Sequence, residues 1–288
     1  MKSIAVLFIL ICSMIGAVVS QNQSGVQYTP LGKCLENPGF EFSARYLGYT
    51  GGMFIEAAMK NKSNQPMNVL VEPGRRLIAD TARCQDLFIV KAYFVTIAPN
   101  SEVKVKIRGF CCESDNSAPI KEMKYSPGYM APEKWVNLAT FINQNEFPED
   151  ATQHAVWVIS NGHDIAGVDC GKREQTLALR KMLCELTGKE MPWATVQYKE
   201  DSTVVFTGAV TRIRGDIQYY VRYNCPVTII LTDNAGRLIK TMMEPTIHGI
   251  GRYTWTLDLD VTNYPSGDYE VRIYEDESIL LDRKKFVI

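Results

Sequence analysis

The order of hydrophobic periodicities along the 288 residues is the feature that most restricts the fold. Short runs with strand-like alternation, such as residues 103–108, fill the chain before Pro119, with turns rich in Pro, Gly and Asn between them. Three segments with helical spacing lie between Pro132 and Gly188, and strand-like runs return after Thr203. Strands followed by helices predict an α+β domain, and strands alone predict a second, all-β domain.

The α+β domain is expected over residues 34–195, as a β-sandwich or barrel plus about three helices. The first helix is predicted to begin at Pro132, because proline is favoured in a first turn. The second begins near residues 148–150 and ends at Asn161-Gly162. The third covers residues 171–186 and ends at Gly188. A polar linker over residues 196–202 then leads to an Ig-like sandwich of about seven strands over residues 203–288.

The N-terminus has the order of a secretory signal. Lys2 precedes an apolar run over residues 4–15, and the small residues Gly16, Ala17 and Ser20 follow. The run is short for a membrane span, which needs about 20 residues. We therefore expect residues 1–20 to be removed, residues 21–33 to be flexible, and the mature chain to be secreted or associated with the outer membrane or cell surface without spanning a membrane.

Export changes the interpretation of the eight cysteines. Cys12 leaves with the signal, and disulfides are permitted outside the cytoplasm. Cys170 and Cys184 flank the third predicted helix, about 21 Å apart by helical rise, so they are not expected to pair with each other. The disulfide candidates are Cys34, Cys84, Cys112, Cys170, Cys184 and Cys225.

Charge and motifs exclude several classes of protein. The formal net charge is −1 and 22% of the residues are charged, so the chain has no electrostatic footprint for nucleic acid and no polybasic lipid anchor. The cysteine spacing matches no zinc pattern, and the chain lacks a phosphate loop, GxSxG and HExxH. We expect no cofactor and no metal.

Two blocks of the first domain resemble bacterial surface thioester domains. Residues 151–160 (ATQHAVWVIS) match their Thr-Gln-x-x-apolar-Trp block at Thr152, Gln153 and Trp157. Residues 108–113 (RGFCCE) match the aromatic-Cys block, with Cys111 in the place of the reactive cysteine. The resemblance implies an adhesin domain in which Cys111 is joined to a glutamine side chain, and the strained acyl group captures a host nucleophile.

The resemblance also requires a later glutamine in an apolar setting. Gln175 lies in a charged helix start, Gln197 lies beside the linker, and Gln218 fits better but belongs to the other domain. Alternatively, Cys111 and Cys112 end a strand with side chains on opposite faces, so that one faces the core and the other forms a disulfide.

The C-terminal domain resembles the Ig-like domain of flagellar hook-cap proteins and the type IX sorting domains of Bacteroidetes. The shared pieces are Asp233-x-x-Gly236, Gly251 ahead of an aromatic strand with Trp255, and Gly267-Asp-Tyr269 before a basic, apolar C-terminus. The resemblance implies a spacer or a sorting element, and a plain Ig-like module without a sorting role stays open.

These observations predict a non-enzymatic adhesion or binding protein of a Bacteroidetes-like cell surface. Its partner would be a protein or glycan surface ligand. Three alternatives remain: a covalent thioester adhesin using Cys111, a structural surface component, and a cysteine hydrolase that pairs Cys111 or Cys112 with His154 or His163.

Overall fold

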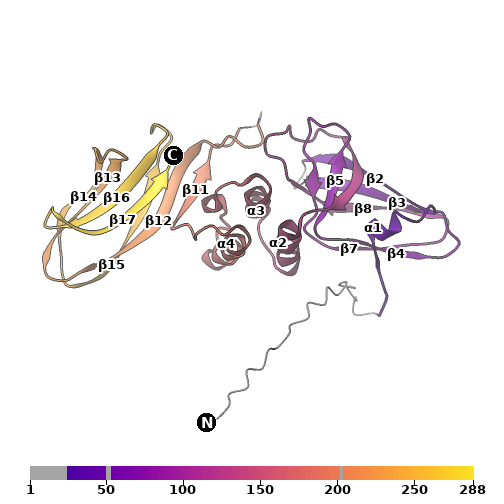
Figure 1. The fold of residues 1–288 in the computed structure, drawn as a ribbon, viewed down its shortest axis with the longest axis horizontal. Coiled ribbons are helices and arrows are strands. Elements are labelled where there is room, and N and C mark those ends of the chain that lie inside the picture. Colours follow the sequence, from indigo (N-terminus) through magenta and orange to yellow (C-terminus); the bar gives the residue numbers. More distant parts are fainter. Residues whose placement is uncertain (1–24, 50–52, 202–203) are drawn as a thin grey trace, which may run out of the picture.

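The computed structural model describes residues 25–49, 53–201 and 204–288 (Figure 1). Three blocks lie in a row: a β block, a helical block and a second β block. The predicted fold class is confirmed, since an α+β part is followed by an all-β part with two sheets. The predicted signal, residues 1–20, lies outside the described residues. No helix among the described residues is long and apolar enough to cross a membrane.

Two sheets enclose the core of the first β block. The smaller has the order β1-β4-β7, and the larger has the order β8-β3-β2-β10-β5-β6-β9. The smaller contains β1 (Thr29–Pro30), β4 (Met67–Val71) and β7 (Tyr93–Ile97). The larger contains β2 (Phe40–Tyr49), β3 (Met53–Asn61), β5 (Arg75–Ala79), β6 (Leu87–Phe88), β8 (Ser101–Arg108), β9 (Phe110–Cys111) and β10 (Lys124–Met130). Their shared core includes Ile55, Val69 and Ile97, all with 0% exposure.

The prediction of a flexible segment over residues 21–33 is wrong where the structure describes it from β1 onward. β1 pairs in parallel with β4, and α1 (Leu31–Cys34) follows at once. Leu31 is completely buried in the core of the first block, which holds this segment in place because apolar burial outweighs the local polar composition.

The three helices occur where the sequence predicts them. They are α2 (Glu133–Gln144), α3 (Glu149–Asn161) and α4 (Arg173–Thr187), with a short 3₁₀ turn, η1 (Ile165–Gly167), between the last two. Gly162 and Gly188 end α3 and α4 in the left-handed region, at φ 76° and 75°. The helices share a second core with the side chains of Phe88, Phe110 and Cys112. Phe88 and Phe110 belong to β6 and β9 at one edge of the larger sheet, and Cys112 directly follows β9.

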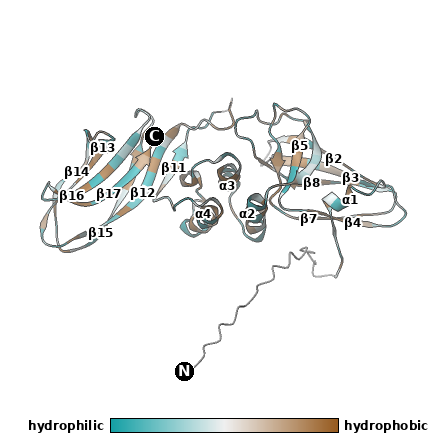
Figure 2. Cartoon of the chain, viewed as in Figure 1, coloured by the Kyte–Doolittle hydropathy of each residue, from teal (hydrophilic) through white to brown (hydrophobic). Residues whose placement is uncertain are grey.

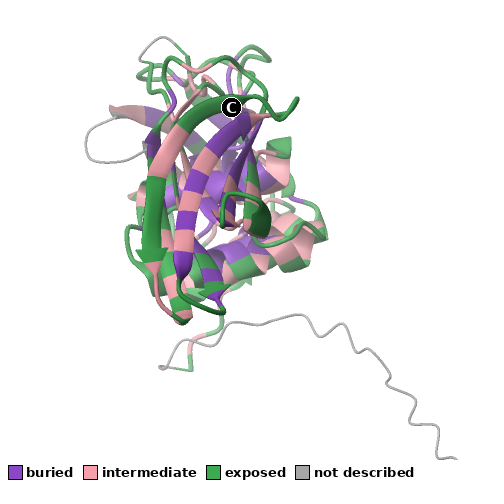
Figure 3. Ribbon diagram, turned by 90° about the vertical axis from the view of Figure 1, so that its left-hand side faces the viewer, coloured by how far each residue is buried: buried purple, intermediate pink, exposed green. Residues whose placement is uncertain are grey.

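The second β block is a sandwich of a three-stranded and a four-stranded sheet, ordered β11-β12-β15 and β14-β13-β16-β17. Its strands are β11 (Ala194–Tyr198), β12 (Val210–Val221), β13 (Cys225–Asp233), β14 (Leu238–His248), β15 (Gly251–Asp260), β16 (Asp268–Glu275) and β17 (Ile279–Val287). Along β12, Ile213, Ile217 and Val221 are fully buried between exposed or half-buried neighbours. Figures 2 and 3 show the same alternation of hydropathy and burial along the strands of this block.

The predicted linker over residues 196–202 is wrong in its first half. Residues 196–198 belong to β11, which pairs with β12 from Ala194↔Gly215 to Tyr198↔Val210. The second β block therefore begins near Ala194 rather than at Thr203. The polar sequence around Lys199 does not indicate a strand. β11 forms because it pairs with β12, which is distant in the sequence.

The predicted disulfides are absent from the described residues, where all seven cysteines are thiols. Five of the cysteines are distributed over three cores, each lined mainly by apolar side chains. Cys34 and Cys111 lie in the first core, Cys112 and Cys170 in the helical core, and Cys225 in the core of the second block. Burial among apolar side chains is the usual environment of a structural cysteine that behaves as a small hydrophobic residue.

Candidate functional site

The two sequence blocks that resemble thioester domains meet in the structure. Gln153 on α3 holds the last residue of β9 through two hydrogen bonds. The Cys111 backbone N–H donates to Gln153 Oε1 at 3.0 Å, and Gln153 Nε2 donates to the Cys111 carbonyl at 2.8 Å. Thr152 lies beside it with its hydroxyl donating to Pro148 O at 2.9 Å. The glutamine thus uses both ends of its amide on the backbone of Cys111.

The two adjacent thiols are buried on opposite sides, as the strand alternation predicts. Cys111 packs in the first core at 4% exposure, and Cys112 packs in the helical core at 1%. Burial raises the pKa of Cys111 strongly, and burial raises the pKa of Cys112 to about 12 although Arg76 opposes the shift. Since the thiolate is the reactive form, both environments disfavour nucleophilic chemistry.

Five aromatic side chains gather where α3 meets the start of the second β block. This aromatic cluster consists of His154, Trp157, His163, Tyr198 and Phe206. Phe206 lies at its centre, with its ring 4.1 Å from His163, 4.8 Å from Tyr198 and 5.6 Å from Trp157 between centroids. His154 stacks against Tyr198 at 6.0 Å. The cluster therefore joins helix α3 to strand β11 and to the segment that follows it.

Gly167 permits the close approach of the two sides. A β-carbon at this position would lie 2.7 Å from Tyr198 Cε2 and 3.6 Å from His154 Nδ1. A side chain here would displace the tyrosine ring from the backbone of η1. The glycine therefore fixes where Tyr198 lies against the helical block.

Arg180 of α4 contacts both sides of the same junction. The residue is 5% exposed. Its guanidinium donates to Ala166 O and Val168 O around η1, and to Ala194 O and Thr195 Oγ1 of β11. One side chain of α4 thus binds the helical block and the second β block together. We call this region, from η1 and α3 to β11 and residues 204–207, the joint.

Two buried ring nitrogens of the aromatic cluster have no hydrogen-bond partner among the described residues. They are Trp157 Nε1 and His163 Nδ1, on rings whose centroids are 5.6 Å apart. His163 uses its other nitrogen, Nε2, in a 2.9 Å hydrogen bond with the buried Ser114 hydroxyl.

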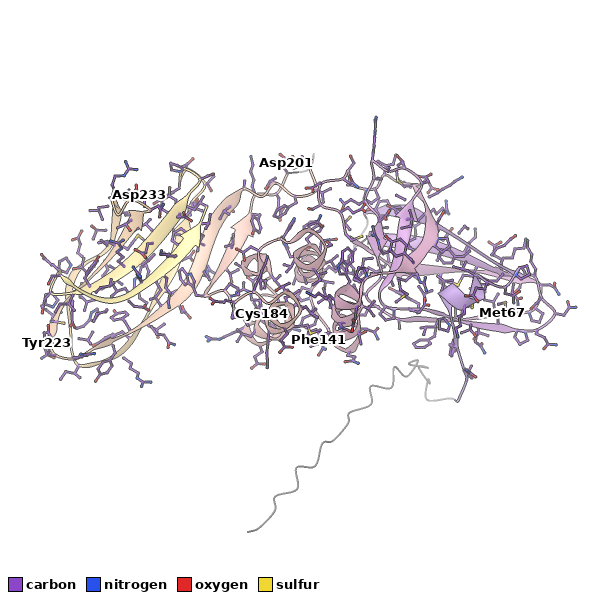
Figure 4. All side chains as sticks on the ribbon, viewed as in Figure 1. Met67, Phe141, Cys184, Asp201, Tyr223 and Asp233 are labelled. Carbon is purple, nitrogen blue, oxygen red and sulfur yellow. The ribbon has the colours of Figure 1, made fainter. Side chains whose placement is uncertain are left out.

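A pocket of ≈ 660 Å³ opens on the joint. We call it the joint pocket. α3 contributes Asp150, Gln153, His154 and Trp157, which recur at helical spacing along one face. The opposite wall consists of residues 196–201 and 204–207, with Gly167, Asp169 and Thr211 completing the lining. Asp201, labelled in Figure 4, lies on the segment between β11 and β12.

A second pocket of ≈ 360 Å³ lies beside the first, lined by residues 114–118 and 204–206. Phe206 lines both pockets, so its ring forms part of the wall between them. Volumes of about 300–1,000 Å³ are typical of small-molecule sites. Tyr198 and Phe206 carry no local sequence signal for this role, because only the packing of the second block against α3 brings them to the joint.

Burial favours the neutral form of both joint histidines. Burial lowers the pKa of His154, although Asp150 opposes the shift. Burial also lowers the pKa of His163, where His154 and Lys189 act in the same direction and Asp115 opposes them. The cysteine-hydrolase alternative lacks support here, since His163 Nε2 contacts a serine hydroxyl.

These shifts predict a loss of stability in mild acid. An unfolded histidine takes up its proton near pH 6.5, whereas the folded histidines resist it, so the free energy of unfolding falls as the pH drops below about 6.5. In His154→Phe, which keeps a ring in place, the fall in the urea midpoint between pH 7.5 and 5.5 should be smaller than in the wild type. An equal fall in both proteins would contradict the assignment, since their carboxylates are identical.

Comparisons with known proteins leave the family open. No family model and no curated protein matches the chain. Solved structures with weak likeness include a β-glucosidase from Kluyveromyces marxianus in complex with glucose (10% identity, 88% of this chain, TM-score 0.20) and the CBM51-2 and INT domains of ZmpB from Clostridium perfringens with GlcNAc (11%, 86%, 0.20). The chain spans 50% of the first and 79% of the second. Likeness at this TM-score carries no argument about function.

Proposed function

We propose that this chain is an exported surface protein that binds its ligand non-covalently in the joint pocket. The helical block and the start of the second β block form the binding part, and the remaining strands of the second β block serve as a spacer or sorting element. The observation that supports this most is the position of the joint pocket: it is lined by Gln153 and Trp157, the residues that the sequence singled out on other grounds.

Preorganisation at the joint supports a binding role. Arg180 holds both walls through four hydrogen bonds, and Gly167 fixes the position of Tyr198. A ligand that enters a pocket with fixed walls loses less free energy to ordering the protein. Buried, protonated Cys111 favours non-covalent binding over thioester capture.

The test is a pair of pocket-blocking substitutions. Asp150→Arg/Val204→Arg places two long side chains at exposed positions of the joint pocket. Labelled wild-type protein, residues 25–288, is applied to arrays of purified glycans and extracellular-matrix glycoproteins. We expect the double variant to lose at least tenfold in affinity for any target that the wild type binds.

The matched control is Glu102→Arg/Ile120→Arg, which makes the same chemical changes at exposed positions of the first block that do not line the joint pocket. It should bind like the wild type. Equal binding by the pocket variant, or no binding by the wild type to any arrayed target, would contradict the proposed function. Bound protein should also elute in denaturant with unchanged mass, because no covalent bond forms.

A further inference from the structure

We propose that two copies of this chain pair through strand β15 of the second β block and form a symmetric dimer. This inference does not depend on the joint pocket or on the function proposed above. Three observations carry it: the other edges of the block are blocked, β15 is a regular and unpaired edge, and its charges complement those of a second copy.

Edge strands offer unpaired backbone N–H and C=O groups to other chains, and proteins usually block them. The two sheets of the second β block end in β11, β15, β14 and β17. β11 lies against the helical block, where Arg180 donates to Ala194 O and Thr195 Oγ1. Since a side chain of the helical block takes a backbone carbonyl of β11, this edge is occupied.

β17 and β14 are blocked by features of their own. β17 carries three consecutive basic residues, 283–285, and Trp193 Nε1 donates to the Lys285 carbonyl at 2.7 Å. The pairing of β14 with β13 contains three register shifts, and Pro245 has no N–H to donate. Bulges, prolines and lysines keep edge strands from pairing with other chains.

β15 has none of these features. It pairs with β12 over ten consecutive residues without a register shift, and it contains no proline or lysine. Among the described residues, no strand pairs with its other side. Figure 1 shows β15 along the lower margin of the second β block. On the core side, Tyr253 and Trp255 remain half-buried, so a further strand would cover more of both rings.

The outward side chains of β15 carry opposite charges at the two ends of the strand. Arg252 lies near the start and Asp260 at the end, with Thr256 midway between them. In a two-fold symmetric dimer the two strands run antiparallel, and every contact occurs twice. With Thr256 opposite Thr256 of the partner subunit, Arg252 lies opposite Asp260 of the partner subunit at both ends. Opposite charges directly across two strands stabilise their pairing.

Contacts within the chain favour this register over its neighbour. Arg212 and Arg214 both bind Asp258, at 2.5 and 2.8 Å. Asp260 and Arg252, by contrast, form no salt bridge among the described residues. A register with Arg252 opposite Asp258 would bring a third arginine to a carboxylate that is already paired, whereas Asp260 is open to a new partner.

The experiment is sedimentation equilibrium of residues 25–288 from about 1 to 100 µM. Pairing along one strand makes a small interface, so we expect a reversible dimer whose share rises with concentration. Arg252→Asp, at an exposed position, places an aspartate opposite Asp260 of the partner subunit at both ends, and it should weaken dimerisation by roughly tenfold or more. A wild type that stays monomeric over this range, or equal dimerisation by Arg252→Asp, would overturn the proposal.

A second variant tests the register. Asp260→Arg should also weaken self-association, because it sets two arginines opposite each other. An equal mixture of Arg252→Asp and Asp260→Arg restores both pairs of opposite charges, so it should associate roughly tenfold or more tightly than either variant alone. Damage to the fold cannot produce such a gain. No gain from two variants that both fold, as judged by circular dichroism, would contradict the dimer; if Asp260→Arg does not fold, the comparison with Arg252→Asp decides alone.

The matched control is Lys240→Asp, which reverses the charge of an exposed side chain on the edge strand β14. It should dimerise like the wild type. If Lys240→Asp separated the dimer and Arg252→Asp did not, the copies would meet through β14, and the assignment to β15 would be wrong.

Discussion

Replacing Arg180 with methionine is expected to lower the free energy of unfolding by about 3–5 kcal/mol. The four hydrogen bonds of the guanidinium are 2.8–3.2 Å long, and three of their acceptors are backbone carbonyls. Methionine matches the length of the arginine stem but donates nothing, so those carbonyls remain buried without partners. Burial disfavours the charge of Arg180 and lowers its pKa, although the carboxylates of Asp169 and Asp164 oppose the shift. None of the four hydrogen-bond acceptors is a carboxylate.

The measurement is urea unfolding followed by circular dichroism. The matched control is Arg173→Met, an exposed position at the start of the same helix, which should change stability by about 0.5 kcal/mol or less. Arg180→Met should also separate the unfolding of the second β block from that of the helical block, because the joint loses its central contact. A loss no larger than that of the control would remove Arg180 from its structural role.

The helices could be predicted closely because their signals are local. Proline before the first turn of α2 and α3 fixes the start, and a left-handed glycine after α3 and α4 fixes the end. Each signal depends on the backbone within a few residues, so no knowledge of the tertiary structure is needed. The opposite burial of Cys111 and Cys112 follows equally directly from the alternation of side chains along a strand.

The extent of the second β block could not be predicted, because its first strand depends on a distant partner. Thr195 pairs with Arg214, and Ala194 is held by Arg180 of α4. Neither contact can be inferred from the residues next to it in the sequence. The absence of disulfides was also beyond the sequence, since the number of cysteines says nothing about which core each one enters.

The candidate site was predicted in part. The Thr-Gln-x-x-apolar-Trp block and the aromatic-Cys block do lie together, with Gln153 bonded to Cys111. The other half of the pocket comes from Tyr198 and Phe206, whose positions depend on how the second block packs against α3. When a site lies between two folding units, the sequence indicates only those of its residues that belong to one short motif.

The second large effect is expected at Gln153. Gln153→Leu removes both hydrogen bonds to the backbone of Cys111, a residue that is 4% exposed, so that water does not readily replace them. We expect the free energy of unfolding to fall by about 2–4 kcal/mol. Gln153→Glu should lie between, because a carboxylate still accepts from the Cys111 N–H but opposes its carbonyl oxygen.

Gln175→Leu is the matched control for Gln153→Leu. It is the same substitution in another helix, and Gln175 makes one exposed hydrogen bond, to Glu146 O at 2.8 Å. Urea unfolding should show a change of less than about 1 kcal/mol there. If Gln153→Leu were no more destabilising than this control, the glutamine would not hold β9 to α3.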